Sequence, residues 1–135
     1  MMIVDGPAIA NEIAESIREA LRAQNQKLLL QAIYLGSDPV VERYLRAKQK
    51  FGERVGIEVV VTNKPELLPN ADGVIVQLPV PAGVDLEWLL AQIPPEKDVD
   101  ALGPASLVLP PVVLAIKEIL ARGAVTLKGK RAVVV

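Results

Sequence analysis

The chain has 135 residues, of which 51% are apolar, so it is long and hydrophobic enough for one domain with a core, or for one domain and the beginning of another. Its 15 basic and 16 acidic residues nearly cancel, and the absence of a basic segment argues against a nucleic-acid partner. The absence of cysteine and histidine excludes disulfides, thiol catalysis, a Ser-His-Asp triad and a zinc site ligated by those residues.

Neither a targeting segment nor a membrane partner is expected. The first residues lack the basic and apolar regions of a secretory signal. The longest apolar run, residues 107–116, is about half as long as a membrane span and is interrupted by prolines. These observations predict a soluble cytoplasmic protein.

The first elements in chain order are a helix and a strand. An apolar start at Ile3 and Val4 and a turn at residues 5–7 precede a predicted scaffold helix over residues 8–24, where apolar residues recur at helical spacing. Residues 28–35 are a nearly continuous apolar run of strand length, which is typical of a parallel strand covered on both faces.

A second helix is predicted over residues 39–55. Asp38 can cap its first turn, Pro39 suits its first position, and Gly56 suits its end. Residues 57–62 are rich in β-branched side chains and predict a second strand. The order strand, helix, strand indicates a right-handed crossover unit.

One face of this second helix combines apolar residues with a lysine. The residues that recur at spacings of three and four, and so share a stripe that should be buried, are Val41, Tyr44, Lys48, Phe51 and Val55. In one interpretation Lys48 lies at the edge of the stripe and extends its ammonium group to water along its apolar stem. In the other, the stripe borders a cleft, where partial burial and the neighbouring ring of Tyr44 suit the lysine to proton transfer. The helix alone does not decide between them.

The next connection, residues 63–72, is too short for a helical crossover and leads into a third predicted strand over residues 73–79. Gln77, near the carboxyl end of that strand, stands where open α/β sheets bind ligands, although neighbouring backbone groups could equally satisfy its amide. After a short predicted helix over residues 84–93, the loop 94–104 is rich in proline and charge, which usually marks a solvated turn.

The last predicted elements are a helix and a strand. Residues 112–122 have the spacing of a helix whose inward face carries Val113, Ile116, Ile119 and Leu120. Residues 127–135 are a basic turn followed by an apolar strand, and such a strand left at a terminus would be an exposed apolar edge. We therefore expect the chain to be the front part of a longer protein.

Three unlike motifs follow one another along the chain. They are Tyr44-Leu45-Arg46-Ala47-Lys48 after Gly36-Ser37-Asp38-Pro39, then Val76-Gln77-Leu78-Pro79-Val80-Pro81, then Pro95-Glu96-Lys97-Asp98-Val99-Asp100. Together they resemble the bifunctional methylenetetrahydrofolate dehydrogenase/methenyltetrahydrofolate cyclohydrolase family. Residues 5–10 and 127–135 are similar to that family too, so the resemblance spans essentially the whole chain.

The resemblance implies a two-domain enzyme whose N-terminal part binds a reduced folate and supplies the catalytic side chains. A C-terminal Rossmann domain would bind NAD or NADP. Residues 1–125 would then be the folate-binding catalytic domain and residues 126–135 the start of the dinucleotide-binding domain, with no cofactor-binding residue and no metal site in this chain. A homodimer at full length and a role in one-carbon metabolism and purine biosynthesis are also implied.

The motifs carry the family's functional residues onto this sequence. Lys48 corresponds to the catalytic lysine, Tyr44 to the tyrosine that packs against the folate, and Gln77 to the glutamine that assists the lysine. Asp100 corresponds to the aspartate that holds the pterin. The expected substrate site consists of these four residues, which are also the expected catalytic residues, together with the pocket positions Val76 and Leu78.

The chain also departs from the family. It lacks the helix that relatives carry between the second and third strands, and Ala101 stands where the family has glycine. Val108-Leu109-Pro110-Pro111 stands where a Pro-Cys-Thr-Pro motif is usual. The sequence ends before the glycine-containing cofactor loop that should follow.

We therefore predict an α/β domain with three layers, α/β/α, and a mainly parallel sheet, truncated at the first strand of a following Rossmann domain. The whole enzyme would oxidise 5,10-methylenetetrahydrofolate to 5,10-methenyltetrahydrofolate with NAD(P) and hydrolyse the product to 10-formyltetrahydrofolate. This fragment alone is not expected to be a dehydrogenase. A non-catalytic folate-binding or interaction module and a generic α/β scaffold remain as alternatives.

Overall fold

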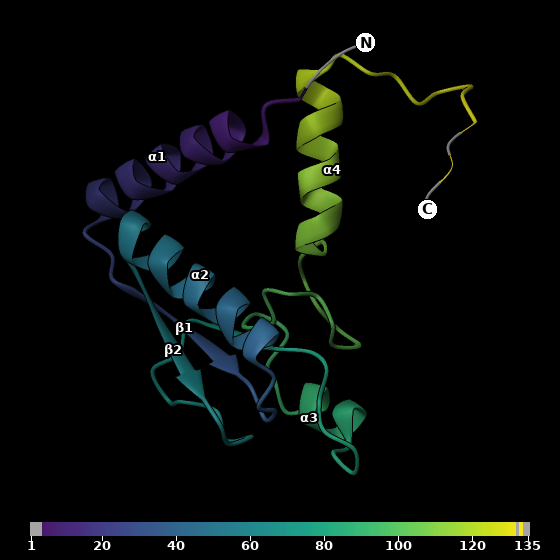
Figure 1. The fold of residues 1–135 in the computed structure, drawn as a ribbon. Coiled ribbons are helices and arrows are strands. Elements are labelled where there is room, and N and C mark those ends of the chain that lie inside the picture. The colour runs from purple at the N-terminus through teal and green to yellow at the C-terminus, as the bar shows by residue number, and fades with distance from the viewer. Residues whose placement is uncertain (1–3, 132, 134–135) are drawn as a thin grey trace.

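The computed structural model describes residues 4–131 and 133, and it contains a small parallel sheet with helices beside it (Figure 1). The strands are β1 (Leu28–Ile33), β2 (Ile57–Thr62) and β3 (Gly73–Val76). Their order in the sheet is β2-β1-β3, and β1 pairs in parallel with both neighbours. The prediction of a mainly parallel sheet is confirmed.

Four helices are present in the described residues: α1 (Gly6–Gln24), α2 (Pro39–Val55), α3 (Leu86–Ala91) and α4 (Pro111–Arg122). The first three begin at aspartates whose side chains accept hydrogen bonds from N–H groups of the first turn at 2.7 to 3.0 Å, namely Asp5, Asp38 and Asp85. Every helix predicted from the sequence occurs, although α3 and the strands β1 and β3 are shorter than predicted.

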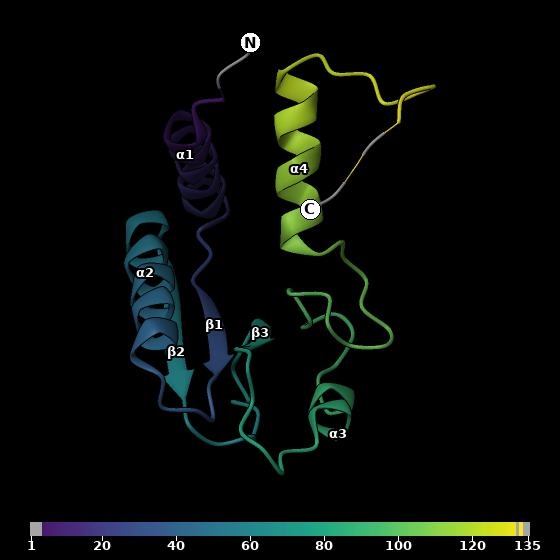
Figure 2. The same cartoon turned by 45° about the vertical axis from the view of Figure 1, so that its right-hand side comes forward.

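Core residues lie on both faces of the sheet. One cluster joins strand residues to Leu89 of α3 and contains Ile33, Val74 and Val76. The other cluster contains the adjacent residues of the strands and of the segment after β1, together with two residues of α2: Ala32, Tyr34, Ile75, Val41 and Leu45. Because successive strand residues point to opposite faces, α2 and α3 cover opposite sides of the sheet (Figure 2). The three-layer arrangement is confirmed.

The connection between β2 and β3 contains no helix, as its length predicts, and Gln31 holds it against the sheet. This side chain is fully buried. Its Nε2 donates to Thr62 Oγ1 at 3.0 Å and to the carbonyl of Glu66 at 2.9 Å, and its Oε1 accepts from the N–H of Leu68 at 2.8 Å. One buried amide therefore anchors this segment to the sheet through three hydrogen bonds.

The buried face of α2 differs from the predicted stripe. Val41 and Val55 are buried as expected, but Tyr44 is 63% exposed and Phe51 is 39% exposed. The prediction that both aromatic residues are buried is wrong. They lie along the side of the helix instead, next to Lys48, which is partly buried.

The close approach of α2 to β2 explains this difference. The buried face includes Leu45 and Gly52. A Cβ atom on Gly52 would lie 2.5 Å from Val59 Cγ2 and 2.6 Å from the carbonyl oxygen of Ile57, so only glycine allows the helix to rest on the strand here. Because of this contact, the face of α2 that carries Leu45 and Gly52 packs on the sheet, and the aromatic side chains of Tyr44 and Phe51 lie outside the buried face.

The helix α4 stands apart from the sheet (Figures 1 and 2). None of its residues is buried, so the predicted inward face is wrong: Val113, Ile116 and Ile119 are 40%, 50% and 37% exposed, and Leu120 is only partly buried. The apolar spacing predicted the helix correctly, but spacing alone does not supply an element for that face to pack against.

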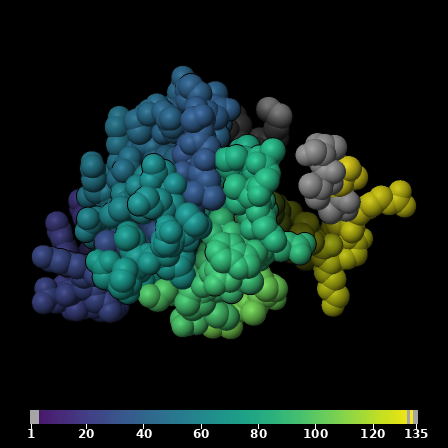
Figure 3. Space-filling model, turned by 90° about the horizontal axis from the view of Figure 1, so that it is seen from below, coloured from purple at the N-terminus to yellow at the C-terminus, as the bar shows by residue number. Residues whose placement is uncertain are grey.

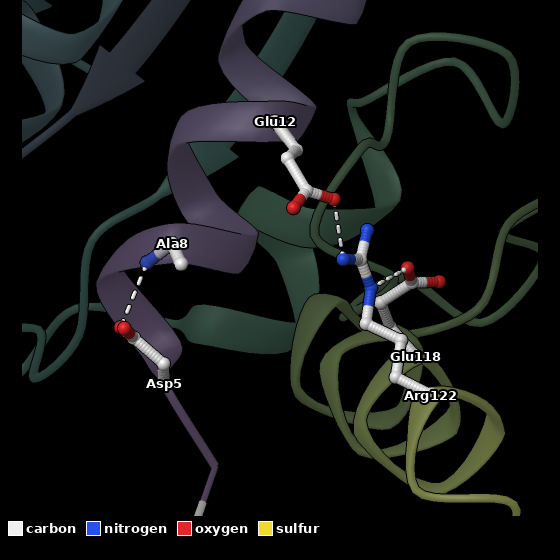
Figure 4. A network of polar contacts seen from close by, with 5 residues as sticks. All are labelled: Asp5, Ala8, Glu12, Glu118 and Arg122. Atoms are coloured by element: carbon white, nitrogen blue, oxygen red, sulfur yellow. Dashed lines mark hydrogen bonds and ion pairs between the residues drawn. The ribbon is translucent and has the colours of Figure 1, made fainter.

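Polar contacts tie α4 to α1 (Figure 4). Arg122 Nη1 donates to Glu12 Oε2 of α1 at 2.5 Å, and Arg122 Nε donates to Glu118 Oε1 of its own helix at 2.7 Å. Two hydrogen bonds raise the pKa of Arg122 above its ordinary value, and the bond to Glu118 has a larger effect than the bond to Glu12. Exposed ionic contacts therefore join α4 to α1, while none of the residues of α4 is buried.

The C-terminal segment after α4 has no helix or strand in residues 124–131. Residues 127–131, where the basic turn is predicted, contain a turn and no strand. Most of the apolar strand predicted after that turn, Ala132, Val134 and Val135, lies outside the described residues, as does Ile3. In Figure 3 the yellow surface of this segment projects from the body formed by the blue, teal and green residues. Within the described residues, no helix combines the length and hydropathy of a membrane span.

Candidate functional site

The predicted lysine and glutamine meet at the carboxyl end of β3. Gln77 directly follows that strand, and its N–H donates to the carbonyl of Ile33 at 2.8 Å, which extends the pairing with β1 by one residue. Lys48 lies in the middle of α2, and its Nζ donates to Gln77 Oε1 at 2.9 Å. The crossover from β1 through α2 and β2 thus brings together two residues from different motifs.

A second contact orients the amide of Gln77. Its Nε2 donates to the carbonyl of Leu78 at 3.0 Å, so its oxygen faces the ammonium group of Lys48. One end of the amide thus bonds to backbone, as one interpretation expects, and the other end accepts from Lys48, while ligand binding by Gln77 stays a prediction. The side chain is only partly buried, which leaves it accessible to a ligand.

An open pocket of about 460 Å³ lies beside this pair. Tyr44, Lys48 and Phe51 line it from α2, and its remaining walls are almost entirely apolar residues of α2, β1 and β2: Leu30, Ala47, Gly52, Val55, Ile57 and Val59. Lys48 is partly buried and borders this cleft, while its role in proton transfer stays a prediction. A flat, largely apolar ligand suits such walls, and the polar end at Lys48 and Gln77 would orient it.

The two pocket positions predicted beside Gln77 differ in exposure. Leu78 is 39% exposed and is accessible to a ligand. Val76 is 2% exposed and packs in the core on the α3 side, so its side chain does not reach a surface pocket. Only the backbone of Val76 remains available for binding.

Asp100 lies in the loop after α3 and is partly buried. Among the described residues, no hydrogen bond joins it to Lys48 or Gln77, so the structure brings three of the four predicted catalytic residues, Tyr44, Lys48 and Gln77, to one place. The chain beside Asp100 nevertheless runs along β3, because Asp98 and Val74 form a parallel bridge. From Asp98 onward this loop runs toward the strand end that carries Gln77.

The sequence did not single out Asp98, yet it is one of two buried polar residues that hold connecting segments in place, the other being Gln31. Asp98 is 4% exposed, and its Oδ2 accepts from the N–H of Gly103 at 2.8 Å. The only available signal was its place in a motif, because nothing in residue type or spacing distinguishes it from the solvated aspartates of a turn.

In the strand, turn and helix formed by β1 and α2, the helix N-terminus is the place where a dinucleotide phosphate would be held. There the carboxyl group of Asp38 accepts from the N–H of Val40 at 2.7 Å. An anionic phosphate would have to displace this carboxyl group. No group of three or more metal-ligating side chains occurs within the residues described.

The fold is that of methylenetetrahydrofolate dehydrogenases. A solved structure of a 5,10-methylenetetrahydrofolate dehydrogenase from the silkworm, Bombyx mori, matches with a TM-score of 0.80 at 26% identity, over 91% of this chain and 52% of that chain. The bifunctional methylenetetrahydrofolate dehydrogenase/cyclohydrolase FolD of Campylobacter jejuni shares the fold with a TM-score of 0.81 at 24% identity, over 91% of this chain and 54% of that chain.

Two of the curated relatives found by sequence are Bifunctional proteins FolD. The Bifunctional protein FolD of Methanoculleus marisnigri is 32% identical over 158 residues, which cover 99% of this chain and 56% of the relative. That of Staphylococcus aureus strain Newman is 32% identical over 160 residues, which cover 98% of this chain and 56% of the relative. The chain is similar in sequence to bifunctional FolD proteins over essentially its whole length, and the resemblance seen in its motifs is confirmed. No family model matches the chain.

The chain spans a little over half the length of these curated relatives. It is also shorter than they are inside the matched region, because an alignment of 158 positions exceeds the 135 residues of the whole chain. Within this chain, the connection of residues 63–72 contains no helix, and the buried amide of Gln31 bonds to it.

Proposed function

We propose that this chain binds a reduced folate and supplies the catalytic side chains of a methylenetetrahydrofolate dehydrogenase/methenyltetrahydrofolate cyclohydrolase. The observation that carries the proposal is the hydrogen bond from Lys48 Nζ to Gln77 Oε1 at the edge of an apolar pocket. The pair lies at the carboxyl edge of a parallel sheet, where such folds bind ligands. The bifunctional names of the relatives support this assignment.

The proposed substrate site begins at the ring of Tyr44. This ring is 63% exposed on the wall of the pocket, so a flat ring of the folate can pack against it. Leu78 would add an apolar contact and Val76 a backbone contact. Asp100 would accept hydrogen bonds from the amino and ring N–H groups of the pterin, which is the contact that distinguishes this ligand from an apolar one.

The proposed chemistry for this chain is the hydrolysis of the methenyl bridge. Water adds to the electron-poor methenyl carbon and loses one proton, which gives a neutral carbinolamine. The bond from that carbon to one of its two nitrogens then breaks as this nitrogen takes up a proton and the hydroxyl group gives up its own, leaving the formyl carbonyl. Lys48 would carry protons in these steps, and the amide oxygen of Gln77 would hold its Nζ in place. Neither step requires histidine, which the chain lacks.

The oxidation of the methylene bridge needs a hydride acceptor, which in the whole enzyme would be NAD or NADP. We assign no residue of this chain to that cofactor, because the Asp38 cap does not fit a dinucleotide phosphate. The whole enzyme would act in the cytoplasm as a homodimer and would serve one-carbon metabolism, including purine biosynthesis.

The test is hydrolysis of 5,10-methenyltetrahydrofolate by the 135-residue chain, which requires no nicotinamide. We expect Lys48→Ala to lower the rate by about 10²–10⁴-fold while the unfolding temperature is kept. Lys50→Ala is the matched control, because Lys50 is an exposed lysine of the same helix, and it should leave the rate unchanged. A rate within about tenfold of wild type in Lys48→Ala would exclude the proposed role of the lysine.

The alternative of a non-catalytic folate-binding module is favoured by one observation, the shortening of the chain within the matched region. Saturable binding of a tetrahydrofolate by a wild-type chain that does not hydrolyse the methenyl compound would support this alternative. Hydrolysis that depends on Lys48 would exclude it.

A further inference from the structure

Asp98 is unusual because it is an aspartate that the fold removes from water. Its side chain is 4% exposed, whereas aspartates are seldom this deeply buried without a specific partner. It borders a small cavity of about 140 Å³ between α3 and the following loop, which is lined mainly by apolar residues. Its partners explain why it is retained there.

The contacts of Asp98 close the loop on both sides. Its N–H donates to the carbonyl of Pro94 at 3.1 Å, and its carbonyl accepts from Ser106 Oγ at 3.3 Å. Its Oδ2 accepts from the N–H of Gly103 at 2.8 Å. One residue therefore bonds to the start, the middle and the end of the segment 94–106.

The backbone places Asp100 inside this closed segment. The backbone carbonyl of Lys97 accepts from the N–H of Val74 at 2.7 Å, so the chain is paired with β3 just before it reaches Asp98. Ala101 then has a φ of 55°, a left-handed conformation that turns the chain back so that Gly103 meets Asp98. Asp100 thus lies at the apex, between the strand-like part and the turn.

The fit at Gly103 makes the closure specific. A Cβ atom on Gly103 would lie 2.9 Å from Asp98 Oδ2, too close for an undisturbed hydrogen bond. The N–H of Gly103 donates to the carboxyl group of Asp98, and the absence of a side chain on Gly103 leaves room for that carboxyl group. A change at either residue disturbs the hydrogen bond that closes the turn next to Asp100.

We propose that Asp98 is a positioning residue for folate binding: its hydrogen bond to the N–H of Gly103 sets the backbone turn that presents Asp100 to the pterin. This inference rests on the proposed function, because it assigns Asp98 a role that acts through Asp100. Asp98 itself does not touch the folate.

The test is isothermal titration of the 135-residue chain with 5-formyltetrahydrofolate. Removal of a buried hydrogen-bond acceptor in Asp98→Ala should weaken binding by at least about tenfold. Asp98→Asn keeps an oxygen that accepts from Gly103, so its affinity should return to within about threefold of wild type. Glu96→Ala, at an exposed position in the same loop, is the control and should bind as wild type does.

A double-mutant cycle separates positioning from a general structural role. If Asp98 acts through Asp100, Asp98→Ala should change the affinity by less than about twofold when Asp100→Ala is already present. Gly103→Ala, which disturbs the same hydrogen bond from its other side, should repeat this pattern and replaces Asp98→Ala if that variant does not fold.

The outcomes distinguish the inference from the function on which it rests. A folded wild-type chain that does not bind 5-formyltetrahydrofolate would overturn both. Wild-type binding with unchanged affinity in Asp98→Ala and Gly103→Ala, or with effects that add fully to those of Asp100→Ala, would overturn the inference and leave the proposed function standing.

Discussion

Lys48 Nζ lies 2.9 Å from Gln77 Oε1, so the middle of α2 is bonded to the residue that directly follows β3. Gln77→Met keeps the length of the side chain and removes the acceptor. We expect the hydrolysis of 5,10-methenyltetrahydrofolate to fall by about ten- to a hundredfold, the equivalent of one hydrogen bond to a charged group. Gln92→Met, which removes an exposed amide at the end of α3, should not change the rate. An equal rate in Gln77→Met and wild type would contradict the assisting role.

Gly52 is the point at which α2 rests on β2. Gly52→Ala places a Cβ atom 2.6 Å from the carbonyl oxygen of Ile57, a backbone atom that cannot move freely. We expect this variant to lose about 1–3 kcal/mol of unfolding free energy, measured by urea denaturation, because the helix must shift outward. Gly6→Ala is the control, since a Cβ atom there meets nothing within 4 Å. Equal stability of the two variants would show that α2 is free to move.

Gln31 holds the connection between β2 and β3. Gln31→Leu is similar in size but leaves the N–H of Leu68 and the carbonyl of Glu66 without this partner. Unsatisfied buried groups cost about 1–3 kcal/mol each, so we expect a loss of at least that amount in urea denaturation. The N–H of Leu68 should also exchange faster with deuterium. Gln24→Leu, at an exposed position of α1, serves as the control, and protection of Leu68 equal to wild type would refute the explanation.

Ala101 adopts a left-handed backbone conformation that favours glycine. Ala101→Gly removes the steric cost of that conformation but makes the unfolded chain more flexible, so we expect a net gain of up to about 1 kcal/mol in unfolding free energy. Ala105→Gly, in the same loop but at an exposed position without a left-handed backbone, should reduce stability instead. The same sign of change in both variants would contradict this account.

Local signals in the sequence predicted most of the fold. Asp38 and Pro39 mark the start of α2 and Gly56 marks its end, because capping depends on neighbouring residues only. The apolar runs of the strands predicted the parallel sheet for the same reason. The motif resemblance associated Lys48 with Gln77, and the structure places them in contact.

The remaining features depend on distant contacts that periodicity does not encode. Two neighbouring stripes of α2, one through Tyr44 and one through Leu45, have similar apolar spacing, and the contact at Gly52 decides which is buried. The burial of Asp98 depends on Gly103 folding back across the loop. The exposed face of α4 shows that amphipathic spacing does not identify a partner.

The central position of β1 also has a consequence for synthesis of the chain. A ribosome adds about 5–20 residues per second from the N-terminus, so β1 and β2 emerge, and can pair, before β3 exists. Until β3 emerges, one edge of β1 lacks its partner, and a nascent chain at this stage has unpaired backbone groups that invite association with other chains or chaperones. Gln77 leaves the ribosome directly after β3. A ribosome-bound chain in which Lys48 has emerged but Gln77 has not therefore lacks the acceptor for the ammonium group of Lys48.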